Sequence, residues 1–455
     1  MPAVLSRAPT PAPFPPGFVW GVATAAPQVE GAADADGKSA SVWDGFARRP
    51  GAVARGDTPA VACDHYHRYR ADFDLMAQLG VRHHRLSLAW PRLMPDGDGR
   101  VNRAGVDHYH RVIDALLERG ITPWVTMFHW DLPQALEARG GWPERLVADA
   151  FADYADLIVR SYGDRVKHWI TLNEIRVFVD NGYAIGRHAP GRKEKAELVN
   201  QAVHHALVGH GHGVRAVREH GGAGAVVGLC DNSSVPIPLV EEAADIAAAE
   251  ALFAAQSCRV LEPIYRGTYG RTYLDFTSGW LPQMAPTDLE LITQPTDFLG
   301  LNLYSGQCVR RGPDGRPEAL AYPVHYPVAD SPWLKLNARA LYWGPRLAAR
   351  VFGVEHLYIL ENGAGYDETP PVNGELFDLH RLEYLRACLR ELKRASDDGV
   401  PVDGYFVWSF LDNFEWADGN GRRFGIVHND FATQVRTPKA SAAWFSRVCR
   451  QNALV

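Results

Sequence analysis

Two glutamates stand at the ends of apolar stretches of the sequence, each beside an asparagine. Glu174 follows the run 169–173, and Glu361 closes the run 357–361. Both runs are rich in β-branched and large apolar residues, as buried strands are. A carboxylate where a parallel strand leaves the core faces the open end of a sheet or barrel, where active sites form. One such glutamate alone is more often a surface acid or helix cap, but a matched pair favours catalysis, with one carboxyl protonated and the other ionised.

The bulk composition is that of a globular protein and argues against several functional classes. The chain has 455 residues, of which 46% are hydrophobic and 22% are charged, within the usual range for soluble domains. A formal net charge of -6 without long charged runs argues against nucleic acid and against an anionic membrane surface as partners. No apolar stretch approaches the length of a membrane span.

The two ends of the chain and its cysteines give further expectations. The N-terminal residues are rich in alanine and proline and lack a basic stretch followed by an apolar one, so we predict a flexible arm over residues 1–13 and not a signal peptide. Residues 14–455 form one predicted domain. Six scattered cysteines without CxxC spacing indicate reduced thiols and a cytoplasmic protein.

Strand-like and helix-like stretches alternate along the whole chain. Helical patterns at 71–79, 104–119, 146–162 and 379–394 separate some of the apolar runs, which predicts a parallel sheet. An open doubly wound sheet would need a glycine-rich phosphate turn after its first strand, and none follows residue 23. We therefore predict an α/β fold of the (β/α)8 TIM barrel type, with extended βα loops and strands at 18–23, 83–89, 121–129, 167–173, 225–231, 298–304, 357–361 and 404–409.

Polar and aromatic residues gather at the predicted strand ends, and a barrel would bring them to one mouth. Amide, imidazole, carboxylate and indole groups together offer hydrogen bonds to hydroxyls and flat faces for stacking, which is the chemistry of a sugar site. These residues are Gln28, Arg85, His129, Trp130, Asn173, Glu174, Asn302, Tyr304, Glu361, Trp408, Glu415 and Trp416.

Several of these residues also have simpler interpretations. Arg85 inside a barrel wall needs a carboxylate partner, and Glu361 would stay ionised beside it. Tyr304 fits strand packing equally well, and His129 alone would be a core histidine. Histidine-rich pieces such as 204–205 and 210–212 lack a third ligand at a recognised spacing, so no metal site is predicted.

The chain resembles glycoside hydrolase family 1 β-glucosidases from about residue 14 to residue 445. The ordered series of matching stretches is specific to that family. It comprises PGFVWGVATA at 16–25, QVEG at 28–31, SVWD at 41–44, ACDHYHRY at 62–69, FHWDLP at 128–133, HAPG at 188–191, DFLGLN at 297–302, WSFLDNFEW at 408–416 and RFG at 423–425.

The resemblance implies a role for each matching residue. Glu174 would be the general acid/base and Glu361 the nucleophile of a retaining hydrolase that needs no cofactor. Asn173 would hold the sugar 2-hydroxyl, while Arg85 and Tyr304 would keep Glu361 oriented and ionised. The glucose subsite would be lined by Gln28, His129, Trp130, Asn302, Trp408, Glu415, Trp416 and Phe424, and Trp333 resembles the tryptophan of the aglycone site.

The expected reaction is removal of terminal non-reducing β-D-glucosyl residues from small glycosides or short oligosaccharides, as in cellobiose degradation. Retention predicts a separation of about 5 Å between the two carboxyl groups. Glu415 stands where relatives acting on 6-phosphorylated sugars carry a phosphate-binding set, so an unphosphorylated sugar is expected. β-Galactosyl and β-fucosyl substrates, transglycosylation and the oligomeric state stay open at this point.

The sequence also departs from the family pattern. Ile175 replaces the proline that usually follows the acid/base, Leu360 replaces the threonine before the nucleophile, and Pro27 replaces a tyrosine. Ile175 and Leu360 motivate, as a competing hypothesis, a sugar-binding barrel without turnover. Both carboxylates are kept, and binding alone gives no reason to keep the pair, so catalysis is the stronger interpretation.

Overall fold

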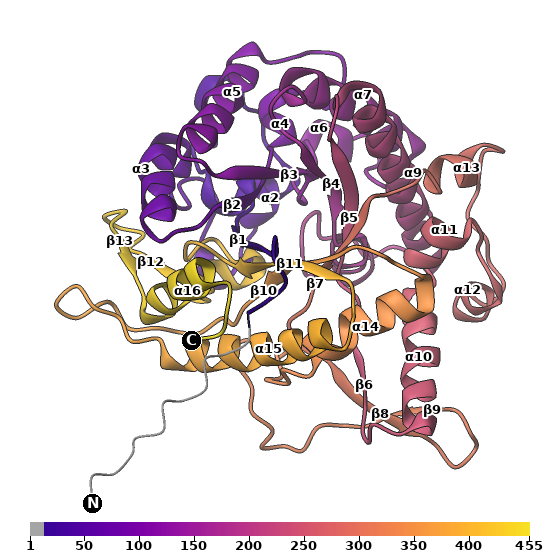
Figure 1. The fold of residues 1–455 in the computed structure, drawn as a ribbon. Coiled ribbons are helices and arrows are strands. Elements are labelled where there is room, and N and C mark those ends of the chain that lie inside the picture. The colour runs from indigo at the N-terminus through magenta and orange to yellow at the C-terminus, as the bar shows by residue number, and fades with distance from the viewer. Residues whose placement is uncertain (1–12) are drawn as a thin grey trace, which may run out of the picture.

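The protein folds into a closed parallel barrel that is ringed by helices (Figure 1). The structure is a computed structural model and describes residues 13–455. The predicted (β/α)8 architecture is confirmed. In order around the barrel, the strands are β1 (Val19–Ala23), β11 (Val402–Trp408), β10 (Leu357–Asn362), β7 (Phe298–Asn302), β5 (Val226–Asp231), β4 (His168–Asn173), β3 (Thr122–Phe128) and β2 (His83–Ser87).

Helices follow the barrel strands along the chain and cover the outside of the barrel (Figure 1). Their apolar residues recur at helical spacing, so each helix buries one stripe against the barrel. In α7, for example, Phe151, Tyr154 and Ile158 are buried on one face. The helices are α3 (His65–Gln78), α5 (Arg103–Glu118), α7 (Arg145–Tyr162), α9 (Ala196–His220), α10 (Ala243–Ser257), α14 (Ala340–Phe352), α15 (Leu379–Asp397) and α16 (Ala440–Gln451).

Shorter elements lie in the connections, mainly on the βα side of the barrel. They include a two-stranded sheet of β12 (Val427–Asn429) with β13 (Arg436–Pro438). The short helices are α1 (Ala26–Val29), α2 (Val42–Ala47), α4 (Trp90–Leu93), α6 (Gln134–Glu137), α8 (Ile175–Val179), α11 (Leu261–Arg266), α12 (Arg271–Phe276), α13 (Asp288–Ile292), η1 (Ala35–Gly37), η2 (Ala54–Gly56), η3 (Asp180–Ile185) and η4 (Trp416–Gly421).

The connection over residues 312–330 contains a short strand. β9 (Pro317–Ala319) pairs with β8 (Gln307–Arg311), which pairs with β6 (Pro236–Pro238). Three residues reading Pro-Glu-Ala carry no alternating pattern, and only the partner strand supplies the hydrogen bonds that define them.

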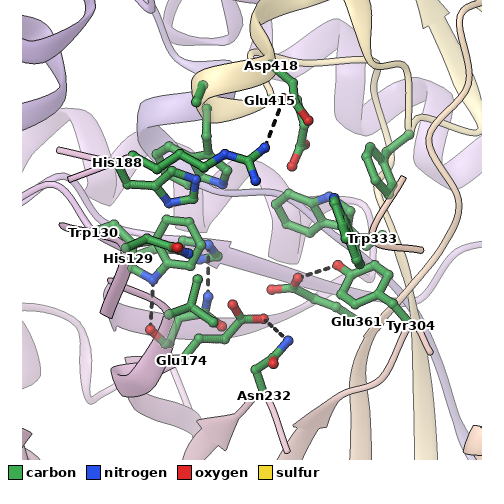
Figure 2. Close-up of a pocket in the computed structure, with 18 residues that line it drawn as sticks. His129, Trp130, Glu174, His188, Asn232, Tyr304, Trp333, Glu361, Glu415 and Asp418 are labelled. Carbon is green, nitrogen blue, oxygen red and sulfur yellow. Dashed lines mark hydrogen bonds and ion pairs between the residues drawn. The ribbon is translucent and has the colours of Figure 1, made fainter. Parts of the chain in front are cut away.

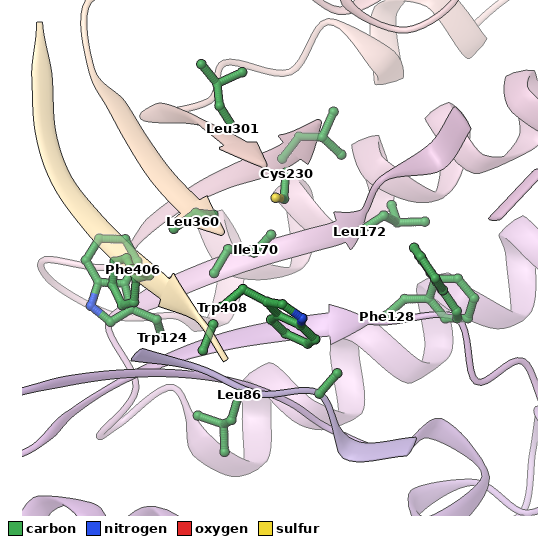
Figure 3. Close-up of a cluster of buried hydrophobic side chains, with 14 of the residues drawn as sticks. Leu86, Trp124, Phe128, Ile170, Leu172, Cys230, Leu301, Leu360, Phe406 and Trp408 are labelled. Carbon is green, nitrogen blue, oxygen red and sulfur yellow. The ribbon is translucent and has the colours of Figure 1, made fainter. Parts of the chain in front are cut away.

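Aromatic and aliphatic side chains pack inside the barrel and support the site from below (Figure 3). The ring of Trp124 meets Phe406 at 5.2 Å and Tyr358 at 4.9 Å, both edge to face. Leu360, the departure next to the nucleophile, is fully buried. A Cβ atom on residue 300 would lie only 2.2 Å from Leu360 Cδ1. Glycine at position 300 therefore makes room for the leucine side chain.

The predicted N-terminal arm lies almost wholly outside the described residues, since residues 1–12 are not described. Pro13 forms an isolated bridge with Ala453, and Phe14 is buried against Phe18 and Trp20. Within residues 13–455, no helix has both the length and the apolar character needed to cross a membrane.

Candidate active site

A pocket of about 300 Å3 opens at the carboxyl ends of the barrel strands (Figure 2). The ends of β4, β10 and β11 and the segments after β3, β4, β5, β7 and β11 contribute its walls, as in other barrels of this type. It is lined by His129, Trp130, Asn173, Glu174, Val177, Asn181, Arg187, His188, Asn232, Tyr304, Trp333, Glu361, Trp408, Glu415, Trp416, Ala417, Asp418 and Phe424.

Glu361 lies near the end of β10 with both carboxylate oxygens held by strong donors. The Arg85 guanidinium donates to Oε1, and the Tyr304 hydroxyl donates to Oε2 at 2.6 Å. Arg85 is fully buried in β2 and Glu361 is 4% exposed, so this charge pair is shielded from water. A guanidinium and a phenol hydroxyl thus fix the orientation of the Glu361 carboxylate at the pocket.

Glu174 follows β4 and has very different surroundings. Its backbone has φ of 53°, a left-handed conformation that is uncommon for residues other than glycine, and α8 begins at the next residue, Ile175. Asn302 Nδ2 donates to Glu174 Oε1 at 2.6 Å, and Asn232 Nδ2 lies 3.4 Å from the same oxygen. Burial, and then the negative charge of Glu361, raise the pKa of Glu174 above its usual range, so its proton is retained at higher pH.

Asn173 connects the two carboxyl groups through a hydrogen-bonded network. Its Oδ1 accepts from Arg85 Nη2 at 2.6 Å and from Asn302 Nδ2 at 3.1 Å. Its Nδ2 donates to His129 Nε2 at 3.0 Å, which leaves the other ring nitrogen of His129 to carry the proton. Burial lowers the pKa of His129 well below its usual value, so the ring is neutral.

Several buried polar atoms at this site have no hydrogen-bond partner among the described residues. They include His129 Nδ1 and Gln28 Oε1. Gln28 Nε2 donates to the Phe414 carbonyl at 3.0 Å, so its free carbonyl oxygen is an acceptor, while His129 offers a donor. Buried polar atoms are normally paired, and an unpaired donor and acceptor at one site match the hydroxyls of a sugar.

Glu415 also lines the pocket, and Gln28 Nε2 lies 3.4 Å from its Oε2. Burial raises the pKa of Glu415 well above its usual range, and the charges of Asp418 and Glu361 add to the effect. A carboxyl held neutral repels a phosphate less than a carboxylate does, which weakens the charge argument for an unphosphorylated substrate. The cation among the lining residues is Arg187, and it is paired with Asp418 at 3.3 Å.

Aromatic faces cover the rest of the pocket. Trp408 and Trp416 both stack near His129, with ring centroids at 5.9 Å. At the outer side, Trp333 is 47% exposed and lies parallel to Phe424, 6.5 Å between centroids. Flat apolar faces of this kind suit the faces of pyranose rings. Trp130 instead packs on Trp416 at 4.5 Å and donates its indole N–H to the Asn173 carbonyl.

The structure brings all the residues expected at the site to one mouth of the barrel. Gln28, Arg85 and Asn302 lie just behind the lining and act through hydrogen bonds. Sequence reasoning missed several lining residues. Asn232 directly follows β5 and could have been found by the strand-end rule that located the others. Residues on longer loops carry no such signal; these are Val177, Asn181, Arg187, His188, Ala417 and Asp418.

One cluster of ligand-type side chains within residues 13–455 is close enough to share an ion: Glu368, Asp412 and His428. The Lys439 ammonium already lies between two of them. It contacts Asp412 Oδ1 at 2.7 Å and also pairs with Glu368. Arg423 adds a second cation at Asp412. The cluster is therefore a buried ion-pair network and not a candidate metal centre.

Comparison with known proteins places this site in a family. The sequence profile of glycosyl hydrolase family 1 matches residues 10–454. The 1,4-beta-D-glucan glucohydrolase of Thermotoga neapolitana is 42% identical over 97% of this chain and 99% of its own length. Beta-glucosidase A of Thermotoga maritima is also 42% identical, over 97% of this chain and 98% of its own length.

Solved structures agree with the sequence comparison. The beta-glucosidase from Thermotoga maritima in complex with glucoimidazole superposes with a TM-score of 0.89 at 42% identity, covering 97% of this chain and 100% of that chain. A Thermotoga maritima family 1 glycoside hydrolase complexed with a cyclophellitol analogue transition state mimic gives the same TM-score at 41% identity, covering 97% of this chain and 99% of that chain. The chain belongs to glycosyl hydrolase family 1.

Proposed function

We propose that the protein is a retaining β-glucosidase that removes terminal non-reducing β-D-glucosyl residues. The observation that carries the proposal is the contrast between its two carboxyl groups. Glu361 is bonded to a guanidinium and a phenol, whereas Glu174 is buried beside amides with a raised pKa. One group suited to attack and one suited to give a proton face the same pocket (Figure 2).

The first step of the proposed reaction forms a covalent intermediate. A carboxylate oxygen of Glu361 bonds to the anomeric carbon as the bond from that carbon to the leaving oxygen breaks. Glu174 gives its proton to the leaving oxygen, so the aglycone departs as a neutral alcohol. Arg85 and Tyr304 keep Glu361 oriented, and the negative charge of Glu361 is consumed in the ester.

The second step releases the sugar. With Glu361 neutral as an ester, the ionised Glu174 takes a proton from water while the water oxygen bonds to the anomeric carbon. The ester bond breaks, Glu361 regains its charge, and Glu174 is again protonated. Two inversions at one carbon leave the configuration retained.

The substrate class follows from the pocket and from the relatives. The free donor on His129 and the free acceptor on Gln28 suit sugar hydroxyls, and Trp333 with Phe424 offers an apolar face for the aglycone. The relatives' names refer to glucosides and 1,4-β-D-glucans, so we place cellobiose and short β-glucan oligosaccharides among the substrates.

Six free cysteines support a cytoplasmic location.

Chemical rescue of an acid/base variant tests the proposal. In Glu174→Ala, an activated aryl glucoside still forms the ester because its leaving group needs no proton. Azide, which needs no base, should then attack the ester and yield β-glucosyl azide. The parallel variant Glu361→Gly should lose turnover and show no such product. Two results with Glu174→Ala would contradict the assigned roles: hydrolysis at the wild-type rate, or formation of α-glucosyl azide by this variant.

A further inference from the structure

Cys230 is a buried thiol beneath the two catalytic carboxyl groups, and neither step of the proposed reaction uses it. It lies on β5, next to the last residue of the strand, and is fully buried among the barrel side chains (Figure 3). Its Sγ is 2.9 Å from Asn302 Oδ1. The other cysteines described here lie outside this network, so Cys230 has a position that no other thiol shares.

The amide of Asn302 must keep one orientation for the acid/base to be held. Its Nδ2 donates both to Glu174 Oε1 at 2.6 Å and to Asn173 Oδ1 at 3.1 Å. Asn173 Oδ1 also accepts from Arg85, so it needs a donor from Asn302 and not an acceptor. A flipped amide would set its oxygen against these two acceptor oxygens, which would repel it.

The remaining atom of the amide, Asn302 Oδ1, is directed at the thiol. Among the described residues, the Cys230 sulfur is its hydrogen-bond partner. Burial raises the pKa of Cys230 well above its usual value, so the sulfur keeps its hydrogen and can donate it. The contact thus satisfies a buried carbonyl oxygen that would otherwise have no donor.

We propose that Cys230 is a positioning residue for Glu174: its S–H donates to Asn302 Oδ1 and fixes the amide orientation in which Asn302 donates to the acid/base. The inference rests on the proposed function of Glu174. This role could not be predicted from the sequence, because a cysteine within an apolar strand is usually a small core residue.

Replacing the thiol by an apolar group of similar size separates this role from packing. In Cys230→Val the amide oxygen has no donor, so Asn302 loses one of its three contacts, and its hydrogen bond to Glu174, which favours the ionised form of that carboxyl, weakens. We expect kcat/KM for cellobiose to fall by about 10-fold, as for a misplaced catalytic group. The fall should be smaller for a dinitrophenyl glucoside, whose leaving group needs no proton, and the alkaline limb of the pH profile should move to higher pH.

Matched variants complete the experiment. Cys230→Ser keeps a donor and should restore the wild-type pH profile and leaving-group dependence. Cys258→Val replaces another buried thiol, packed between Tyr269 and Tyr273 away from the site, and should leave both unchanged. Thermal melts report folding, and Cys230→Ala replaces Cys230→Val as the donor-free variant if the valine variant does not fold.

Two results would overturn the inference. One is a folded donor-free variant with the wild-type pH profile and leaving-group dependence. The other is an equal loss in the serine and donor-free variants for both substrates, which indicates packing alone. A wild-type enzyme that hydrolyses neither substrate would instead refute the proposed function, and is thereby distinguished from failure of the Cys230 inference.

Discussion

At the scale of single residues, two identical side chains acquire opposite properties from their neighbours. Glu361 faces a buried guanidinium and a phenol hydroxyl, while Glu174 has only amide donors and the repulsion of Glu361. Glu174 therefore keeps its proton to higher pH than an ordinary carboxyl, while Glu361 is held by two strong donors, and our proposal divides the catalytic roles along this contrast. The surroundings, and not the residue type, assign the roles.

The raised pKa of Glu174 has a consequence for stability. A carboxyl whose pKa is higher in the folded state than in the unfolded state binds its proton more tightly when folded, so its contribution to stability falls as pH rises above the unfolded value. Glu174→Gln cannot lose this proton. We predict that the variant is more stable than the wild type at pH 9, by roughly 1–3 kcal/mol, with little difference at pH 4.

Thermal melts of both proteins across that pH range check this prediction. Asp131, another buried acid with a raised pKa, is not influenced by Glu174 and titrates alike in both proteins, so its contribution cancels in the difference between the two curves. A constant offset between wild type and Glu174→Gln at all pH values would contradict the prediction.

At the scale of elements, the strand ends decide which residues meet, and this much could be read from the sequence. The apolar runs that end at Asn173 and Glu361 predicted β4 and β10 to within a residue, because a buried parallel strand is apolar on both faces. The helix α3 begins at His65, six residues before the predicted start. Its first turn is polar and aromatic, and its place is decided by tertiary contacts such as the stacking of Tyr66 on His108 of α5, with ring centroids 4.0 Å apart.

The loop after β11 depends on a buried ion-pair network for its position. Asp412 in this loop is fully buried and pairs with Lys439, at the start of α16, and with Arg423. The neighbouring residues Asn413 and Phe414 accept hydrogen bonds from Gln28. The network therefore holds the segment that carries Glu415 and Trp416 at the pocket.

We predict that Lys439→Met destabilises the protein by about 3–5 kcal/mol, because it leaves the buried carboxylates with too few partners. The loop should loosen, so KM for an aryl glucoside should rise. Thermal melts and steady-state kinetics measure both effects. Arg100→Met, which breaks the exposed pair of Arg100 with Asp96, is the control and should change neither Tm nor KM. Equal behaviour of the two variants would contradict the assigned role.

At the scale of the whole molecule, residues 13–455 contain the closed barrel and every residue of the pocket. Alternation of strand and helix patterns was sufficient to predict this architecture, since few folds satisfy it. The side-chain network was not predictable in the same way. The contact of Cys230 with Asn302 joins residues 72 positions apart, and only the register of β5 against β7 brings them together.

The one-domain interpretation predicts that the first 12 residues can be removed without loss of stability or activity. Deletion of residues 1–12 should leave Tm and kcat/KM unchanged, because their alanine- and proline-rich sequence predicts a flexible arm. By contrast, Phe14→Ala should destabilise by about 3–4 kcal/mol, since the ring is buried against Phe18 and Trp20. Thermal melts and kinetics of both variants decide the matter. A deletion as harmful as Phe14→Ala would show that the arm belongs to the folded domain.

Covalent trapping tests the central claim most directly. A 2-deoxy-2-fluoro-β-glucoside with a good leaving group slows breakdown of the ester more than the enzyme can overcome, so the sugar stays attached to the nucleophile. Proteolysis and mass spectrometry should then find the fluoroglucosyl group on Glu361 and on no other residue, with stoichiometric loss of activity. A label on Glu174 or another residue, or full activity with no label at all, would contradict the account.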